Sequence, residues 1–335
     1  MKPALRFLVV ALGLALFGWF VHRAGVGEIA RAFSNLGWFA PIALLPFALV
    51  YLLDTLGWRL AFGPAGLEKI GFRMLARIRW AGESINSVLA SVYVGGEAVK
   101  VHLLQKRGVP TMNAASSVVA GKTAQVLAQV VFLGIGSFAG AANLPADSPV
   151  RAGMLAVTGA AVAIVGLLFW LQNRGMFSSL LWLTERLRLN IRALATRAES
   201  LRRLDQRIFD FYRHDHRHFI LSTLAYLGGW MADTLEILLV SHLLGMPVEW
   251  SQALAVEAFI SVAKAVGIFV PGALGVQESG IVFLFYLFGL PPALAVSYAV
   301  IRRGREVVYA LVGGAFLYAD GLSLRPRDVP EVKVA

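Results

Sequence analysis

The sequence contains no cysteine, and only 15% of its 335 residues are charged. A chain without cysteine forms no disulfide, binds no zinc through thiolates and has no thiol nucleophile. The low charge is informative too, because soluble globular domains carry about 25% charged residues. Motifs of soluble enzymes are also missing: there is no Gly-x-Ser-x-Gly, no Walker loop and no zinc-ligand spacing. We therefore expect no enzymatic activity, no cofactor and no metal site.

Hydrophobic residues make up 58% of the chain and lie in long blocks rather than in amphipathic stripes. Such blocks are typical of segments that lie in hydrocarbon. The net charge of +11 comes from basic residues between the blocks, where membrane proteins have their cytoplasmic loops, so it does not indicate nucleic acid as a partner. These features predict an all-α polytopic membrane protein, with residues 1–335 as a single integral membrane domain.

Six segments are long and apolar enough to cross a bilayer, which takes about 20 residues. They are residues 4–21, 38–62, 114–141, 154–171, 219–244 and 291–319. Two more regions, 72–104 and 253–288, are apolar but are interrupted at Gly95, Gly96, Pro271, Gly272 and Gly275. Because glycine and proline weaken or break helices, we expect each region to be a re-entrant or short helical hairpin. A pair of full crossings is the alternative.

The segment between the fourth and fifth spans, residues 172–218, contains ten arginines. Short basic loops stay in the cytoplasm, so this loop sets the orientation of the other segments. With the N-terminus inside, the loop is cytoplasmic only if the first hairpin enters and leaves on the same side. The second hairpin then opens to the outside. We expect a multi-pass inner-membrane protein with a cytoplasmic N-terminus and a cytoplasmic tail, residues 320–335.

Two segments of the chain align with each other without a gap. The most informative pairs are Glu97, Gly108, Pro110, Ser116 and Lys122, which align with Glu278, Gly289, Pro291, Ser297 and Arg303. Asp54-Thr55-Leu56 and Asp233-Thr234-Leu235 extend the match upstream. The repeats are about residues 1–141 and 152–319. Each contains three spans, an odd number, so the second copy enters from the opposite side, as in many secondary transporters. A duplication kept for packing alone is the alternative.

Polar side chains lie within the predicted spans, where an ionisable group costs about 2.5–3.5 kcal/mol at a helix centre. Lys122, Gln125 and Gln129 share one helical face, which we expect to face the interior of the bundle. The matching span contains a cluster of charges near mid-bilayer, Arg302, Arg303, Arg305 and Glu306. Arginine has planar donors that suit phosphate. We predict that these seven residues bind a substrate or lipid headgroup.

Acidic and amide side chains are candidates for a coupling role or for a network with these cations. They are Glu97, Glu278, Asp54, Asp233, Glu83 and Asn86. Glu97 and Glu278 each follow a glycine-containing break, so they are also placed to stabilise the first turn of a half-helix. Glu306 is spaced to pair with Arg302 or Arg303 on its own helix. The alternative to a functional site is a static ion-pair network that holds the bundle together.

Several of these segments resemble one known family. The similarity lies in residues 82–87 (GESINS), 95–100 (GGEAVK), 116–122 and 270–278 (VPGALGVQE), and in Arg302 and Arg303. They are similar to the transmembrane, flippase-like region of lysylphosphatidylglycerol synthases, and most similar to its stand-alone, hopanoid-biosynthesis-associated (HpnL-type) members. In the synthases a separate cytoplasmic domain transfers the amino acid, and the sequence to Ala335 does not contain that domain. The resemblance implies lipid translocation in a bacterial inner membrane, with roles for Glu97, Lys122, Glu278 and Arg303.

The preferred prediction is a flippase or transporter for a hopanoid or for an anionic or aminoacylated phospholipid. Its expected partners are membrane lipids. Two alternatives remain: a non-catalytic membrane subunit that positions lipid-biosynthesis enzymes, and an intramembrane enzyme that modifies lipid, in which Glu97 or Glu278 would act as acid or base.

Overall fold

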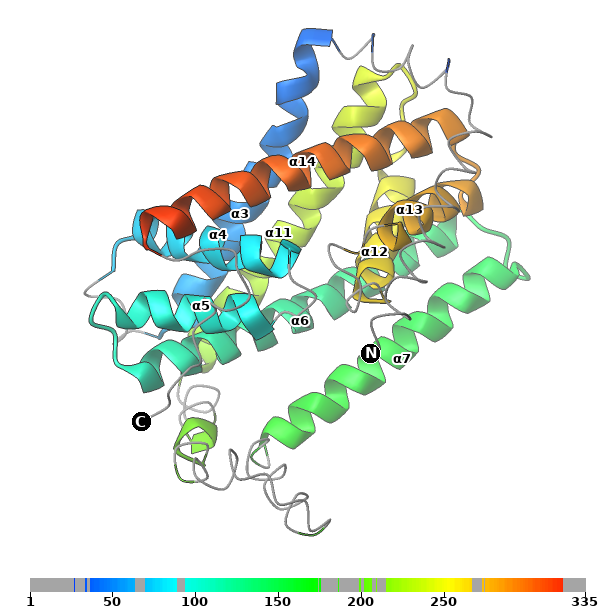
Figure 1. Cartoon of the computed structure of the whole chain (residues 1–335). Coiled ribbons are helices and arrows are strands. Elements are labelled where there is room, and N and C mark those ends of the chain that lie inside the picture. Colours follow the sequence, from blue (N-terminus) through cyan, green and yellow to red (C-terminus); the bar gives the residue numbers. More distant parts are fainter. Residues whose placement is uncertain are drawn as a thin grey trace.

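The computed structural model describes residues 37–63, 70–88, 94–173, 215–266 and 275–321, with a few isolated positions outside these ranges. Within the ranges every regular element is a helix (Figure 1). The elements are η1 (Gly37–Leu44), α3 (Leu45–Leu60), α4 (Phe72–Val88), α5 (Val94–Gln105), α6 (Thr111–Ala142), α7 (Pro149–Asn173), α11 (His216–Leu243), α12 (Trp250–Val266), α13 (Val276–Leu287) and α14 (Pro292–Ala319). The predicted all-α class is confirmed.

Four helices are long and apolar enough to cross a membrane, and they coincide with four of the six predicted spans. They are Pro41–Leu60, Thr111–Ala142, Pro149–Gln172 and His216–Leu243. Helix α14 has the length of a span, 28 residues, but it carries four charged side chains within residues 302–306. The predicted first span, residues 4–21, lies outside the described residues, as do Pro271 and Gly272.

The turns before α6 and α14 have the same geometry, as the sequence match between them predicts. Gly108 and Gly289 both adopt positive φ, 81° and 67°, which glycine tolerates without a steric penalty. In each turn the following residue closes a hydrogen bond back to the preceding helix, from Val109 N to Leu104 O and from Leu290 N to Phe285 O. Pro110 and Pro291 then stand at the N-caps of α6 and α14 with nearly equal angles. The two turns therefore have the same backbone conformation at corresponding positions.

The helices pack reciprocally between two groups, which we call the first half (α3–α6) and the second half (α11–α14). Helix α3 packs along α11, α4 of the first half packs on α14 of the second, and α12 of the second half packs on α6 of the first. The pairs α3 and α11, and α6 and α14, run in opposite directions (Figure 1). The short pair α4–α5 lies beside the end of α14, and the pair α12–α13 lies towards the opposite end of the bundle.

Small residues let the central helices approach closely. A Cβ on Gly57 of α3 would lie 2.8 Å from the ring of Tyr226 on α11, and one on Gly229 of α11 would lie 2.5 Å from Asp54 Oδ1. Such close approach is usual where transmembrane helices associate. It brings the matching aspartates Asp54 and Asp233, both buried, into the middle of the bundle.

Helix α7 packs against α6 and otherwise presents exposed apolar side chains, including Leu155, Ile164, Leu167 and Trp170. Its polar contacts to α6 include one between Ser137 Oγ and Thr158 Oγ1 at 2.5 Å and, near its end, one from Gln172 Nε2 to Thr123 Oγ1 at 3.0 Å. An apolar helix exposed on most of its surface is what a lipid-facing span requires.

Candidate functional site

Five charged side chains form a network at the centre of the second half, which we call the central network. Arg302 and Arg305 of α14 point to Asp233 and Glu236 of α11 and Glu257 of α12. Arg302 binds Glu257 with both nitrogens, Nη1 to Oε2 at 2.7 Å and Nη2 to Oε1 at 2.8 Å. Arg305 Nη1 lies 2.9 Å from Asp233 Oδ1 and also binds Glu236.

The central network is almost completely shielded from solvent. Arg302 and Arg305 are 2% and 1% exposed, and Glu236 and Glu257 are 0% exposed. Charges this deep are tolerated only when they are paired and hydrogen-bonded. The hydroxyl of Tyr298 accepts from Arg302 Nη1 at 2.6 Å and supports the same group. The network therefore ties α11, α12 and α14 together.

The other face of α14 carries a second set of contacts, the second-half cluster. Arg303 Nε lies 2.5 Å from Glu278 Oε1, and Arg303 Nη1 lies 3.0 Å from Glu306 Oε2. Glu306 also accepts from Gln277 Nε2 at 2.9 Å and from Lys264 Nζ at 3.2 Å. Of the two pairings predicted for Glu306, the one with Arg303 forms. Arg302 instead faces Glu257, because one residue along a helix turns the side chain by about 100°.

Glu278 has the predicted position at the start of a half-helix. Its Oε2 accepts a hydrogen bond from the backbone N–H of Gly275 at 2.8 Å, and Gly275 has φ of 78° directly before α13. A carboxylate there satisfies an otherwise unpaired donor and is favoured by the helix dipole. Because the other oxygen binds Arg303, Glu278 joins the end of α13 to α14.

The first half has its own charged residues, the first-half cluster. Lys100 Nζ lies between Glu83 Oε1, at 2.7 Å, and Glu97 Oε1, at 3.0 Å. Lys122 Nζ donates to Gln125 Oε1 at 3.1 Å. These five side chains and Arg79, Trp58, Val118 and Tyr226 line a small cavity of about 10 Å³.

Asp54 links the first-half cluster to the middle of the bundle. Its Oδ2 accepts from Arg79 Nη2 at 2.5 Å and lies 3.5 Å from Gln125 Nε2. Arg79 also stacks on the ring of Tyr51, 5.1 Å from its centroid. Asp54 and Asp233 each pair with a buried arginine, Asp54 with Arg79 of α4 and Asp233 with Arg305 of α14.

The tip of the α4–α5 pair is held by Asn86 and two glycines. Asn86 Oδ1 accepts from the N–H of Gly96 at 2.9 Å, and a Cβ on Gly96 would lie 2.3 Å from the carbonyl oxygen of Gly82. Gly95 and Gly96 lie in the first turn of α5. They therefore do not end a helix there; Gly96 allows α4 and α5 to touch, which positions Glu83 beside Lys100.

Twelve of the predicted residues thus lie in or directly beside charged clusters, whereas Gln129, half-buried on α6, makes no hydrogen bond to the described residues of any cluster. Five further charged residues were not predicted from the sequence as site residues: Arg79, Lys100, Glu236, Glu257 and Lys264. Each is a charge inside a predicted apolar region or span, which is itself a signal of an interior site. Glu236 also stands three residues after Asp233 and so shares its helical face.

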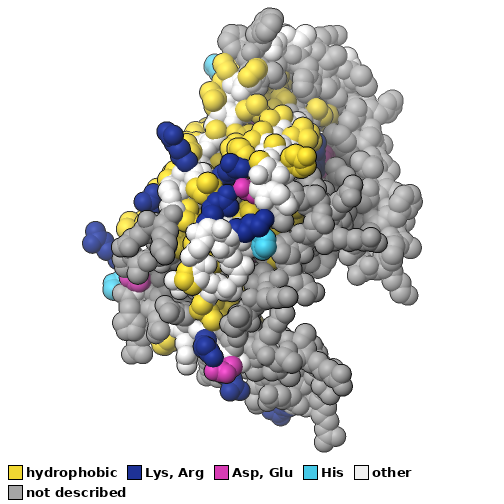
Figure 2. Space-filling view, turned by 60° about the vertical axis from the view of Figure 1, so that its left-hand side comes forward, with side chains coloured by type: hydrophobic (Ala, Val, Ile, Leu, Met, Phe, Trp, Pro, Cys, Tyr) yellow, Lys and Arg dark blue, Asp and Glu magenta, His cyan; other side chains and the backbone are white. Residues whose placement is uncertain are grey.

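Asp320, at the end of α14, contacts basic side chains from other helices at one end of the bundle, which we call the basic end. Its Oδ1 binds Arg107 Nη2 at 2.8 Å and Arg77 Nη2 at 3.3 Å, and its carbonyl accepts from Lys106 Nζ at 3.1 Å. Figure 2 shows lysine and arginine side chains gathered beside hydrophobic surface on one face of the molecule. At the opposite end, α6 meets α12 through a neutral hydrogen bond from Asn143 Nδ2 to Ser251 Oγ at 2.9 Å.

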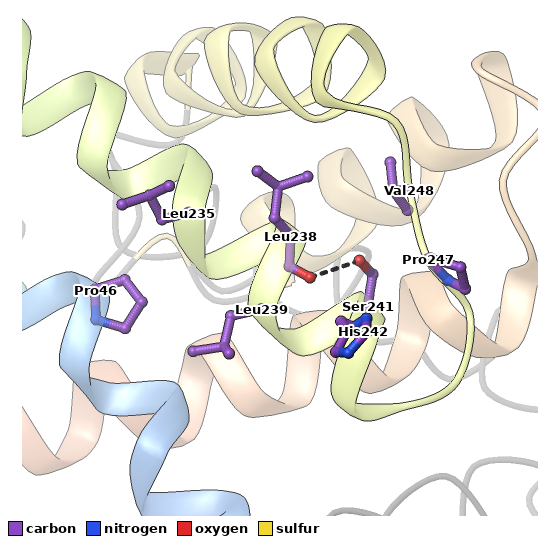
Figure 3. Close-up of a pocket in the computed structure, with 8 residues that line it drawn as sticks. All are labelled: Pro46, Leu235, Leu238, Leu239, Ser241, His242, Pro247 and Val248. Carbon is purple, nitrogen blue, oxygen red and sulfur yellow. Dashed lines mark hydrogen bonds between the residues drawn. The ribbon is translucent and has the colours of Figure 1, made fainter.

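A separate apolar groove of about 570 Å³ lies between the start of α3 and the end of α11. Figure 3 shows its lining residues, Pro46, Leu235, Leu238, Leu239, Ser241, His242, Pro247 and Val248. The hydroxyl of Ser241 donates to Leu238 O at 2.9 Å, so this polar wall atom is satisfied within α11. The groove suits hydrocarbon better than a charged group.

No metal site is evident in the described part of the chain, where His, Asp and Glu do not gather in groups of three or more able to hold an ion. The comparison with curated proteins found no match. The model of the family described as the lysylphosphatidylglycerol synthase TM region matches residues 5–313, which is nearly the whole chain. The protein is a membrane protein of a family involved in lipid handling. The chain belongs to the family of lysylphosphatidylglycerol synthase transmembrane regions.

Proposed function

We propose that this protein moves a lipid between the leaflets of a bacterial inner membrane, and that its two halves form an inverted repeat around the charged centre. The observation that carries the proposal is that each of two groups of helices that pack reciprocally buries a set of charged side chains. Charge at this depth is expensive in a membrane and is usually kept for a substrate or ion pathway. Membrane transporters built from inverted repeats bind their substrates at the repeat interface.

The inverted repeat is supported by three features of the helices. The turns at Gly108 and Gly289 share one register, matching helices run in opposite directions, and each short helix pair packs on the last helix of the other half. In this arrangement α4–α5 is a re-entrant hairpin from the cytoplasmic side and α12–α13 is one from the outside. Broken helices of this kind are tolerated where protein or water, rather than lipid, surrounds them.

While a lipid crosses the membrane, its headgroup and its apolar part need different surroundings, and the protein provides both kinds. The charged clusters suit a headgroup, and the apolar groove beside α3 and α11 suits an acyl chain or a hopanoid skeleton. We assign different roles to the cations. Arg302 and Arg305 hold helices together, because they are almost completely buried and pair with carboxylates of α11 and α12, whereas Lys122 and Arg303 are less buried and face the clusters next to the hairpins. Translocation of this kind needs no chemical step.

Alternating access also needs an interface at each end that opens, and the two ends differ in strength. The basic end is held by ion pairs of Asp320 with Arg77 and Arg107, whereas the opposite end has the Asn143–Ser251 hydrogen bond. Charge-assisted contacts are stronger than neutral ones. We therefore expect the resting protein to open more readily at the end where α6 meets α12.

Reconstitution into liposomes tests the proposed function. We expect the wild-type protein to move a labelled anionic phospholipid, an aminoacylated phospholipid or a hopanoid between leaflets, and Lys122→Ala and Arg303→Ala to slow this movement by about tenfold or more, the scale of losing a charged contact. Arg217→Ala is the matched control, because Arg217 is exposed at the start of α11. If no lipid moves faster than in protein-free liposomes, the proposal fails and a subunit or lipid-modifying enzyme becomes the better explanation.

A further inference from the structure

We infer that Glu236, in the central network, holds a proton in the arrangement of helices seen here and exchanges it with water when the helices separate, so that lipid movement is coupled to a proton. The inference rests on the proposed function and names the ion that would drive it. The observation behind it is an excess of negative charge at the centre of the second half.

The two halves differ in their balance of buried acids and bases. The first-half cluster, with Asp54 and Arg79, has three acids and three cations: Asp54, Glu83, Glu97, Arg79, Lys100 and Lys122. The second half has five acids against four cations: Asp233, Glu236, Glu257, Glu278, Glu306, Arg302, Arg303, Arg305 and Lys264. The excess lies in the central network, where three carboxyl groups face two arginines. An unbalanced charge at this depth is costly.

Glu236 is an acid that the first half lacks. The match between Asp54-Thr55-Leu56 and Asp233-Thr234-Leu235 places Gly57 opposite Glu236. Gly57 allows close contact between helices, because a Cβ there would lie 2.8 Å from the ring of Tyr226. At the same position the second half carries an ionisable group instead. The additional acid is therefore a difference between the halves and not a common feature of their packing.

Glu236 is also the carboxyl group of the central network with the fewest hydrogen bonds to its oxygens. Asp233 receives Arg305 on Oδ1 and Arg302 on Oδ2, and Glu257 receives Arg302 on both oxygens. Glu236 Oε2 binds Arg305, but Oε1 has no partner among the described residues, and Glu236 is 0% exposed. A charged oxygen left unpaired there costs far more than a neutral hydroxyl. We therefore place the proton on Glu236 Oε1.

Neither an ordinary gap in the hydrogen bonding nor a metal ion accounts for the additional acid. Asp320 Oδ2 also lacks a partner in the described part of the chain, but Asp320 pairs with both Arg77 and Arg107, so its charge is compensated. A metal ion needs several ligand oxygens directed at one point. The acids of the described residues do not form a group that could hold one.

Charged and titratable groups surround Glu236 on the helices that pack on α11. The hydroxyl of Tyr298 lies 3.4 Å from Glu236 Oε2 and 3.3 Å from Glu257 Oε2, so it bridges the two glutamates and can pass a proton between them. The groups that act on Glu236, directly or through a neighbour, are Asp233 of α11, Glu257 and Lys264 of α12, Tyr298, Arg302, Arg305, Glu306 and Tyr309 of α14, Tyr51 and Asp54 of α3, and Lys122 of α6.

Protonation of Glu236 changes which arrangement of the helices is favoured. With the proton bound, the central network has no net charge and stays shielded from solvent. Without it, the network has a net negative charge, which favours an arrangement in which water reaches Glu236. A ligand shifts a conformational equilibrium when it binds one state better than the other. Water on one side gives the proton to Glu236 and water on the other side takes it, so only an O–H bond forms and breaks.

Infrared spectroscopy of the purified protein tests the proton directly, because a protonated carboxyl group has a C=O stretch at higher frequency than a carboxylate. At neutral pH we expect a band that disappears in Glu236→Gln and remains in Glu249→Gln, which changes an exposed acid. Glutamine has the shape and charge of a protonated glutamate, so Glu236→Gln should unfold within a few degrees of the wild type. Glu257→Gln removes an ionised partner of Arg302 and should unfold at a clearly lower temperature.

Liposomes test the coupling. With the membrane potential held at zero and one proton moved per lipid, a gradient of about one pH unit should enrich a trace of labelled lipid in one leaflet by up to about tenfold. The probes are phosphatidylglycerol, lysylphosphatidylglycerol and a hopanoid. We expect wild-type enrichment with Glu249→Gln and none with Glu236→Gln. A sodium gradient of the same size, without a pH gradient, should enrich no lipid.

The inference is overturned if no infrared band depends on Glu236, if Glu236→Gln is as unstable as Glu257→Gln, or if lipid enrichment follows sodium or survives Glu236→Gln. Lipid movement that a pH gradient does not drive would reject the coupling and leave the proposed function intact. The band in a protein that moves no lipid would support the proton on Glu236 and reject the proposed function, so the two failures are distinguishable.

Discussion

Replacing Arg302 with methionine should lower the free energy of unfolding by about 3–5 kcal/mol, the usual cost of removing one partner of a buried ion pair. Methionine fills most of the space of the arginine stem but carries no charge. Glu257 would lose its bidentate contact, and Asp233 would keep one of its two arginines. Because Glu257 is fully buried, it has no water to replace the lost guanidinium.

The measurement is the unfolding temperature and denaturant midpoint of purified protein in detergent. Arg203→Met is the control, since Arg203 and its partner Glu199 are both exposed, and exposed ion pairs contribute little. The double variant Arg302→Met with Glu257→Leu should regain part of the loss, because it removes the unpaired carboxylate as well. An Arg302→Met protein as stable as Arg203→Met would mean that the central network does not hold α12 against α14.

Replacing Gly96 with alanine should separate α4 from α5 and abolish lipid movement. The new Cβ would lie 2.3 Å from Gly82 O and 2.4 Å from Asn86 Oδ1, and real contacts of this kind are never so short. The carbonyl belongs to the backbone, so the helices themselves must shift. Overpacking of this kind costs about 1–3 kcal/mol. The shift would also draw Lys100 on α5 away from Glu83 on α4.

Gly134→Ala is the control, because a Cβ at Gly134 on α6 meets nothing within 4 Å. Alanine favours helix more than glycine does, so this variant should be at least as stable as the wild type. Comparison of unfolding temperature and lipid movement for the two variants checks the prediction. If Gly96→Ala retains wild-type stability and transport, the close contact between α4 and α5 does not exist in the membrane.

Several features followed directly from the sequence because they depend on local chemistry. Gly108 and Pro110, and their counterparts Gly289 and Pro291, specify a helix end, a turn and a helix start regardless of what surrounds them. Glu278 was placed correctly at the start of a half-helix for the same reason. The helical class and four of the spans followed from length and apolar content.

The sequence does not predict which side chains on different helices contact one another, because these contacts depend on how the helices cross. The sequence shows that Arg302 and Arg305 share one face of α14 and Arg303 and Glu306 share another. It does not show that α12 brings Glu257 to the first face. The two faces differ in the structure: Arg302 and Arg305 are deeply buried among carboxylates, whereas Arg303 and Glu306 contact side chains of α12 and α13.

The sequence also does not predict the contact between Gly82 and Gly96. Both lie in segments that resemble the family, but glycine in an apolar region predicts a break as readily as it predicts close packing. Only the arrangement of α4 and α5 shows that Gly96 allows contact rather than ending a helix.

The reactivity of a single cysteine at position 118 tests most directly whether the charged cavity is reached from both sides of the membrane in turn. Val118 lines the cavity and is 7% exposed, and the chain has no other cysteine, so Val118→Cys introduces one reporter. In liposomes of known orientation, a small charged thiol reagent should modify it from either side, and Asp320→Asn should speed modification from the basic end. Modification from one side only, in both backgrounds, would contradict alternating access through this site.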